Sequence, residues 1–425
     1  MDHYASERNG PGPAGEMNLR IARPLILATL VIMAPPAQGQ LLSGPGGALG
    51  ALPPVVPDTL ERVGGALDDT VRALPTARLT ERLRAARAAR IGDLLRRHGD
   101  AVELDDRREP ARRGIVLLTG AKADELQRLR AAGYGTESEE IEGLGLGVTR
   151  LAVPQGRSLA RALRDVRKLA PDAEASADNL YFQSGAAARA EAPITANRSV
   201  AGRVLGLIDG GVARHPALDA PIEQQAFAHG APRASTHGTA VASLLSGRGS
   251  VRGAAPGAPL LVADVYGDDP AGGSAFAIAR ALGWMVSRKV PVVTLSLVGP
   301  DNPLLAGAVR LARDRGVTLV AAVGNDGPAA PLAYPASYPG VIAVTGVDGR
   351  GRPLPEAGRA AHVDFSAPGA DMQAATPDGG KGPVRGTSYA APLVAGRLFA
   401  VGSLQALRAE AGKRRLVCGD CRNND

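Results

Sequence analysis

The sequence predicts an α/β protein, in which a mostly parallel β-sheet with helices on both faces follows a small α+β domain of ferredoxin-like order, βαββαβ. From residue 203 onward, near-continuous apolar runs alternate with segments of helical spacing, which indicates buried parallel strands. Only 3% of the 425 residues are aromatic and 54 are glycine, so the core must be built from Ala, Val and Leu. We therefore expect close packing between helices and sheet.

Residues 1–40 have the outline of a secretory signal peptide, in which Met17 is an alternative start. Two arginines precede an apolar core from Pro24 to Ala34, and prolines and small residues follow it. Because a membrane-spanning helix needs about 20 apolar residues, we expect no stable membrane span. A buried helix of a cytosolic protein is the alternative. Arg outnumbers Lys by 44 to 5, which is typical of a GC-rich bacterial coding sequence. Together with the signal peptide, this predicts a secreted or periplasmic bacterial protein.

Residues 41–110 combine a linker with a helix rich in Arg and Ala. Up to Pro57, Gly, Pro and Leu occur without a period. From Ala77 to Asp100, Leu and Ile recur at helical spacing among arginines, which predicts an amphipathic basic helix packed on one side. Membrane-surface binding or an adaptor role is the alternative. The net charge of +7 is spread along the chain and there is one Trp, so we expect no nucleic-acid partner.

Residues 111–185 form the predicted small domain. Its strands and helices follow in the order GIVLLTG, AKADELQRLRAAG, YGTESEEIEG, LGVTRLAVP, GRSLARALRDVRKLA and SADNLYF. Folds of this kind host many functions, so the order of elements alone does not indicate a role.

Residues 199–425 form the predicted large domain. Its apolar strands are VLGLIDGG, PLLVADVYG, PVVTLSLVG, VTLVAAVGN and VIAVTGVD, and its helices include THGTAVASLLSG, GSAFAIARALGWMVSRK and PLLAGAVRLARDRG. Ligand chemistry in such sheets gathers at the carboxyl ends of the strands. Polar residues occur at these places, since Asp209 and Asn325 end strands, while His237 and Ser388 open helices.

These four residues can supply the parts of an acyl-transfer site. Such a site needs a nucleophile, a base, a group that orients the base, and donors for the developing oxyanion. Ser388 is the candidate nucleophile, His237 the base and Asp209 its orienting group. Asn325 and the backbone N–H of Ser388 are the candidate oxyanion donors. Taken singly, each residue also fits an ordinary turn or a helix start.

Four segments together resemble the subtilases, the subtilisin-like serine proteases. They are LGLIDGGV around Asp209, STHGTAVASLLSG around His237, AAVGNDG around Asn325, and RGTSYAAPLVAG around Ser388. The order Asp, His, Ser is that of subtilisin, and no GxSxG motif of α/β-hydrolases occurs. The resemblance implies a subtilisin-like fold and a Ser-His-Asp triad, with Asn325 completing the oxyanion hole.

The resemblance also implies that substrate binds as an added strand on the segment Ser296, Leu297, Val298 and Gly299. Val298 stands where the family usually has Gly, and it could narrow or re-aim the specificity pocket. Gly210 replaces a Thr that many members have beside the catalytic Asp. Only 37 residues follow Ser388, fewer than is usual in the family, and we expect one more helix there.

The small domain resembles the subtilase propeptide, which assists folding and inhibits by laying its last strand along the active-site cleft. In this chain that strand is SADNLYFQSG, from Ser176 to Gly185, and a cut near Gln183, Ser184 or Gly185 would release it. NLYFQS also resembles the recognition site of a potyviral protease used in engineered sequences, so an engineered origin is an alternative.

The resemblance therefore implies a secreted serine endopeptidase that acts on polypeptides and is made as a zymogen inhibited by its own prodomain. A prodomain-locked peptide-binding protein with little turnover is the alternative. The chemistry requires no cofactor. Structural calcium is common in the family, and the loop Gly267–Gly273 is a candidate site, with a solvated turn as the alternative. Cys418 and Cys421 lack two further zinc ligands nearby, so we expect a local disulfide or two idle thiols.

Overall fold

The computed structural model describes residues 76–183, 194 and 197–421. The predicted signal peptide and most of the predicted linker lie outside the described residues. The basic helix predicted from Ala77 to Asp100 is present as α3 (Thr76–Arg97). Leu83, Arg87 and Arg90 are partly buried while most of their neighbours in this helix are exposed, which confirms packing on one side.

The small domain contains the predicted succession of strands and helices. Its elements are β1 (Val102–Leu104), β2 (Pro110–Thr119), α4 (Ala123–Ala131), β3 (Gly135–Ile141), β4 (Leu146–Ala152), α5 (Leu159–Leu169), β5 (Glu174–Asn179) and β6 (Phe182–Gln183). The antiparallel strands are ordered β3-β4-β2-β5, and β1 pairs with the first part of β2.

The last predicted strand of this domain, SADNLYF, is interrupted. Asn179 is the final residue of β5, and the chain then leaves the sheet at Leu180 and Tyr181. Phe182 and Gln183 instead pair antiparallel with β11 (Leu297–Val298) of the large domain. The predicted strand is therefore two short strands, of which β5 belongs to the sheet of the small domain and β6 pairs with β11 of the large domain.

The large domain is built on seven parallel strands in the order β14-β13-β12-β10-β7-β9-β8. These strands are β7 (Leu205–Asp209), β8 (Ile222–Ala226), β9 (Leu260–Asp264), β10 (Val292–Leu295), β12 (Thr318–Ala322), β13 (Ile342–Val347) and β14 (Phe365–Pro368). The helices are α6 (Thr236–Ser246), α7 (Ala275–Ser287), α8 (Pro303–Asp314), α9 (Thr387–Val401) and α10 (Leu404–Ala411). A hairpin, β15 (Met372–Ala375) and β16 (Lys381–Val384), precedes α9.

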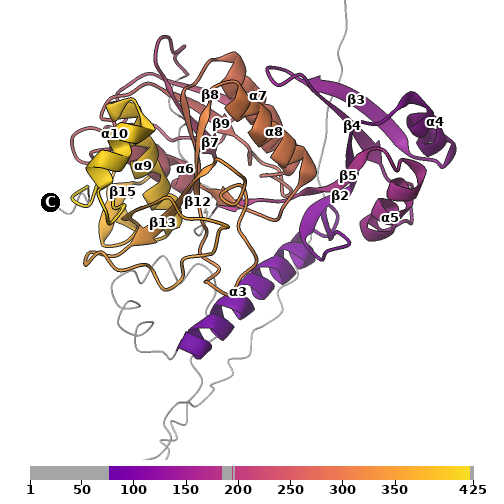
Figure 1. Cartoon of the computed structure of the whole chain (residues 1–425), viewed down its shortest axis with the longest axis horizontal. Coiled ribbons are helices and arrows are strands. Elements are labelled where there is room, and N and C mark those ends of the chain that lie inside the picture. The colour runs from indigo at the N-terminus through magenta and orange to yellow at the C-terminus, as the bar shows by residue number, and fades with distance from the viewer. Residues whose placement is uncertain (1–75, 184–193, 195–196, 422–425) are drawn as a thin grey trace, which may run out of the picture. The chain divides into compact units, whose positions relative to one another are not determined.

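Helices cover both faces of this sheet, as predicted. Alternate residues of the central strands enter different cores: Leu205 and Leu207 pack with α6 and α9, whereas Ile208 packs with α7 and α8. Figure 1 shows α7 and α8 on one side of the strands and α9 and α10 on the other. Because both faces are buried, the sequences of the central strands are continuously apolar rather than alternating.

The sheet of the small domain packs on α7 and α8 and shares a hydrophobic core with them. Leu117, Ile141 and Val148 of the small domain belong to the same buried cluster as side chains of these two helices. The closest approach involves Gly283 of α7, where a Cβ atom would lie 2.2 Å from the Glu142 carbonyl oxygen. This contact is therefore possible only with glycine at position 283.

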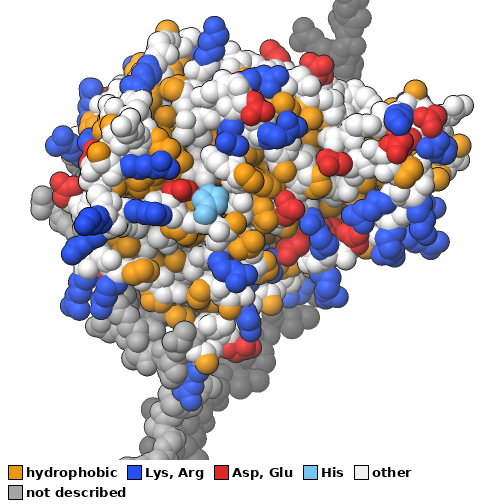
Figure 2. All heavy atoms as spheres, viewed as in Figure 1, with side chains coloured by type: hydrophobic (Ala, Val, Ile, Leu, Met, Phe, Trp, Pro, Cys, Tyr) orange, Lys and Arg blue, Asp and Glu red, His pale blue; other side chains and the backbone are white. Residues whose placement is uncertain are grey.

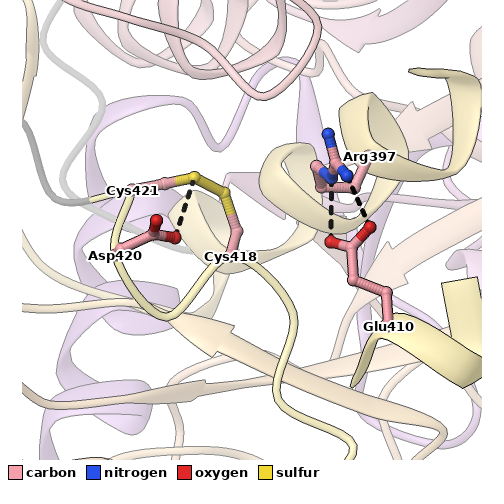
Figure 3. The surroundings of a disulfide bond; sticks show 5 residues. All are labelled: Arg397, Glu410, Cys418, Asp420 and Cys421. Atoms are coloured by element: carbon pink, nitrogen blue, oxygen red, sulfur yellow. Dashed lines mark hydrogen bonds and ion pairs between the residues drawn. A yellow bond between two sulfur atoms is a disulfide. The ribbon is translucent and has the colours of Figure 1, made fainter. Parts of the chain in front are cut away.

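The C-terminal segment forms the expected further helix, α10, and ends in a disulfide between Cys418 and Cys421 (Figure 3). Val417 N–H donates to the Ser366 carbonyl oxygen at 2.8 Å, which ties the segment to β14. Arg397 of α9 binds Glu410 of α10, with 2.9 Å between Nε and Oε1. The two sulfurs are bonded to each other, so they are not thiolate ligands for a metal.

Charged side chains of both signs are mixed on the surface. On the face seen in Figure 2, basic side chains lie among acidic ones and form no single continuous basic area. Among the described residues, no single helix is both long enough and apolar enough to cross a membrane. The helices α9 and α10 meet these two requirements only when taken together, and they are bent by 118° relative to each other.

We predict that Gly283→Ala loosens the small domain, because the added methyl group collides with the turn at Glu142. Overpacking of this kind costs about 1–3 kcal/mol. Hydrogen exchange of the intact chain should therefore show reduced amide protection in β3 and β4. Gly307→Ala is the matched control, since a Cβ atom there has only an ordinary contact, 3.8 Å from Leu146. Equal protection in both variants would contradict the prediction.

Candidate active site

Asp209 and His237 meet at the carboxyl end of the central strand β7. Both carboxylate oxygens of Asp209 lie 3.0 Å from Nδ1 of His237, and both side chains are fully buried. The Gly210 N–H also donates to Asp209 Oδ1 at 2.7 Å. Since the carboxylate holds Nδ1, the other ring nitrogen, Nε2, is available for proton exchange; it is buried and has no hydrogen-bond partner among the described residues.

Small residues allow the end of β7 to approach the start of α6. A Cβ atom on Gly238 would lie 2.3 Å from the Gly210 carbonyl oxygen, and one on Gly210 would lie 2.4 Å from Ser235 Oγ. Ser235 caps the helix by accepting from the Gly238 N–H at 2.8 Å. The Gly at 210 thus makes room for the cap of the helix that carries His237.

Ser388 lies in the first turn of α9, directly after a sharp change of chain direction. Gly386 precedes the helix with φ +138° and ψ 162°, a conformation that favours glycine. Ser388 is fully buried, and its Oγ lies 3.5 Å from the Ser296 carbonyl oxygen. The next residue, Tyr389, has its ring 5.4 Å from the His237 ring. The predicted nucleophile and the predicted base therefore lie in adjacent helices.

Asn325 lies at the N-terminal end of the same helix. Its Oδ1 accepts the Thr387 N–H at 3.0 Å, and Thr387 Oγ1 donates to the Gly324 carbonyl oxygen at 3.2 Å. The amide oxygen is therefore engaged as an acceptor, and the NH2 group is the part of the Asn325 side chain that donates. The helix dipole makes this region favourable for negative charge.

The predicted substrate-binding segment is occupied by the chain itself. Leu297 pairs with Gln183 and Val298 pairs with Phe182 across the two short strands. Ser296 Oγ donates to the Ser388 carbonyl oxygen at 2.8 Å and so ties the segment to the start of α9. The Val298 side chain lies against Gly324, where a Cβ atom would be 3.2 Å from it.

Gln183 makes a contact that the sequence analysis did not predict. Its Nε2 donates to Asp209 Oδ1 at 2.6 Å, and the side chain is buried. The sequence placed this strand in the cleft, but no sequence signal pointed to a contact with Asp209. The small domain therefore reaches the Asp–His pair directly.

Tyr181, two residues before Gln183, forms hydrogen bonds through its hydroxyl, its backbone N–H and its carbonyl oxygen. Its side chain is fully buried, and its hydroxyl donates to the Pro300 carbonyl oxygen at 2.7 Å. Its backbone N–H donates to the Gly273 carbonyl oxygen at 2.8 Å, and its own carbonyl oxygen accepts from the Tyr266 hydroxyl at 3.0 Å. The strand thus lies between β11 and the loop that ends at Gly273.

The loop Gly267–Gly273, the candidate calcium site, has its carboxylates engaged by arginines. Asp268 binds Arg233, and Asp269 binds Arg112 of the small domain, each at 2.5 Å. The two carboxylates therefore bind different arginines, one of them from the small domain.

Asp264, the last residue of β9, is a second buried carboxylate beside the end of β7. Burial raises the pKa of Asp264, and the negative charge of Asp209 acts in the same direction, while three backbone N–H donors oppose the shift. Burial, with the charges of these two carboxylates, also holds the pKa of the Tyr266 hydroxyl well above its usual range. Tyr266 therefore remains a hydrogen-bond donor at neutral pH.

Helix α3 covers a cavity of about 350 Å³ beside Asn325. Arg90 donates to Asp326 at 2.9 Å, and its guanidinium lies 5.4 Å from the centre of the Phe182 ring. Arg87 bridges Glu109 of the small domain and Asp326, at 2.8 and 3.4 Å. The sequence predicted the helix but not this contact with the loop that follows β12.

Comparison with known proteins gives a consistent result. A family model described as "Subtilase family" matches residues 201–407. The "Major intracellular serine protease" of Bacillus subtilis (strain 168) is 37% identical over 178 residues, which is 40% of this chain and 56% of that protein. "Subtilisin BL" of Lederbergia lenta is 34% identical over 217 residues, which is 49% of this chain and 80% of that protein.

The fold has a solved counterpart in fervidolysin from Fervidobacterium pennivorans, described as a keratinolytic enzyme related to subtilisin. The TM-score is 0.58 at 17% identity, over 74% of this chain and 61% of that one. At this identity the likeness concerns the fold alone. It covers more of the chain than the family model does, so it extends beyond residues 201–407. With the fold, the motifs and the relatives in agreement, the chain belongs to the subtilase family.

Proposed function

We propose that the chain is a serine endopeptidase that hydrolyses peptide bonds through an acyl-enzyme. The observation that carries the proposal is the buried pair of Asp209 and His237, which lies next to the helix start that bears Ser388. Membership of a family that contains serine proteases supports it.

In the proposed mechanism, Ser388 Oγ attacks the carbonyl carbon of the substrate while His237 Nε2 takes its proton. Asp209 keeps the Nδ1–H tautomer and stabilises the imidazolium that forms. The Asn325 amide and the Ser388 N–H donate to the oxyanion. His237 then gives the proton to the leaving amine, and a water molecule, activated by the same base, hydrolyses the acyl-enzyme.

We further propose that the chain is a zymogen in which the small domain blocks the cleft. The antiparallel register supports one particular cleavage site. Phe182 pairs with Val298 and Gln183 pairs with Leu297, so a strand that continues this register brings its next residue opposite Ser296. The Ser296 carbonyl oxygen lies 3.5 Å from Ser388 Oγ. The next residue in the sequence is Ser184, so the proposed scissile bond is Ser184–Gly185.

Helix α3 provides a second attachment of the zymogen. Its arginines bind Asp326, next to the proposed oxyanion residue Asn325. Leu83 lies against Gly327, where a Cβ atom would be 2.6 Å from Leu83 Cδ1. After cleavage at residue 184, these contacts would still hold the severed segment and delay its release.

The outline of the signal peptide in residues 1–40 supports secretion, or export to the periplasm, as the proposed location. Cleavage after export would then confine activity to that compartment.

We expect Ser388→Ala to abolish peptide hydrolysis. Loss of the nucleophile of such a triad lowers kcat by about 10⁶-fold. A fluorophosphonate probe should label the processed protein at Ser388 and leave the variant unlabelled. A processed protein that binds peptides but takes up no probe would contradict the protease proposal and favour the prodomain-locked peptide-binding protein.

We expect the double variant Arg87→Ala, Arg90→Ala to release the severed segment several times faster. Each partly exposed ion pair contributes about 0.2–1 kcal/mol, and the gain should shrink at high salt because salt screens the pairs. The lag before labelling of Ser388 measures the release. Arg96→Ala is the control, since Arg96 pairs with Asp93 within the helix. The prediction fails if the lag is the same in both variants.

A further inference from the structure

We infer that Asp264 is a positioning residue of the site, because its buried carboxylate holds two loops of the large domain together. One loop, residues 227–235, leads into α6 and so to His237. The other loop, residues 265–273, carries Tyr266. This inference rests on the proposed protease function, since the positions of these side chains affect turnover only if the chain hydrolyses peptide bonds.

The sheet places Asp264 directly beside the proposed catalytic carboxylate. Asp264 ends β9 and pairs with Asp209, the last residue of β7, in the parallel register. The Val265 N–H donates to the Asp209 carbonyl oxygen at 3.0 Å, so the two strand ends are joined where the chain leaves the sheet. Both side chains are fully buried. Any group that Asp264 binds is therefore held close to Asp209.

The Asp264 carboxylate accepts hydrogen bonds from three backbone N–H groups, which belong to the two different loops. Its Oδ2 atom accepts from Arg233 at 2.8 Å. Its Oδ1 atom accepts from Tyr266 and from Gly267, each at 3.0 Å. Hydrogen bonds to an ionised acceptor are stronger than neutral ones, and a buried carboxylate needs such donors in place of water. One planar group thus connects both loops.

Arg233 belongs to the loop that sets the position of His237. It lies shortly before Ser235, the N-cap of α6. The Ser235 N–H donates to the Gly211 carbonyl oxygen at 2.8 Å, and a Cβ atom on Gly211 would lie 2.3 Å from the Arg233 carbonyl oxygen. The loop is therefore held on one side by the chain that follows β7 and on the other by the carboxylate. Because His237 lies in the first turn of α6, these contacts set where its ring lies.

Tyr266 brings the second loop to the strand that occupies the cleft. Its hydroxyl donates to the Tyr181 carbonyl oxygen at 3.0 Å, a main-chain contact that any residue of a bound strand could make. Gly267 has φ +49°, and a Cβ atom there would lie 2.7 Å from the His229 carbonyl oxygen of the first loop. The two loops thus meet at this turn as well as at the carboxylate, and a shift of one displaces the other.

The test compares Asp264→Ala with the wild-type chain, because the variant loses both acceptor oxygens and so separates the loops. Both are measured as processed proteins, with active sites counted by the fluorophosphonate probe at Ser388. One substrate is a fluorophore-labelled casein, which is unfolded and long enough to reach Tyr266. The other is p-nitrophenyl acetate, which is too small to reach it.

We expect kcat per active site to fall about tenfold or more with both substrates, since a misplacement of about 1 Å can cost 10²-fold in rate. KM should rise several-fold for casein alone, because the hydrogen bond from Tyr266 to the substrate is weakened. Asp264→Asn keeps one acceptor oxygen and should recover part of both losses. Unchanged kcat and KM per active site in Asp264→Ala would overturn the inference.

Asp348→Ala is the matched control. Asp348 is also buried, and its Oδ1 accepts the backbone N–H groups of Arg350 and Arg352 at 2.8 and 2.9 Å, in the turn after β13. Its loss should lower the melting temperature and leave kcat and KM per active site as in the wild type. If both variants lose kcat equally, the effect is general destabilisation and the inference fails.

Native-state hydrogen exchange of the processed wild-type protein tests the same bonds if Asp264→Ala does not yield processed protein. The amides of Arg233, Tyr266 and Gly267 should exchange as slowly as those inside β9, because each donates to the buried carboxylate. Exchange at the rate of unprotected loop amides would overturn the inference. A processed wild-type protein that takes up no probe would refute the protease proposal, and with it the role of Asp264 in turnover, whatever the exchange rates.

Discussion

The buried carboxylate of Asp209 is the constraint on which the arrangement of the site depends. A carboxylate that is removed from water is stable only when donors satisfy it. Here the donors come from three parts of the chain: the Gly210 backbone, the His237 ring and the Gln183 amide. Two of them belong to the large domain. The third comes from the small domain, so the site and its proposed inhibitor share one hydrogen-bonded group.

The same constraint explains the small residues around the site. His237 can reach Asp209 only if α6 begins close to the end of β7, and Gly210 and Gly238 make that approach possible. Gly386 turns the chain so that α9 begins beside Ser296. With these close contacts in place, side chains from four separate segments lie at one edge of the sheet, so the proposed chemistry would need little reorganisation.

The sequence predicted the parts of the structure that carry a local pattern. Five parallel strands were predictable because both faces of the sheet are buried and the strands are continuously apolar. The strands β8 and β14 were not predicted, because they lie at the two edges of the sheet and their sequences, IEQQA and FSAP, are not continuous apolar runs. The motifs also predicted which residues would gather at the site. The contacts of Gln183 with Asp209 and of Arg90 with Asp326 link polar residues far apart in the chain and leave no periodic signal.

The account is tested most directly by the N-terminal residue of the large domain after processing of the purified, protease-free chain. It predicts that this residue is Gly185, because a strand that continues the register of Phe182 and Gln183 would bring its next residue opposite Ser296, whose carbonyl oxygen lies 3.5 Å from Ser388 Oγ. A large domain that begins at Ser184, after a cut at the position expected for a potyviral protease, or at any other residue, would contradict the register that joins the two domains.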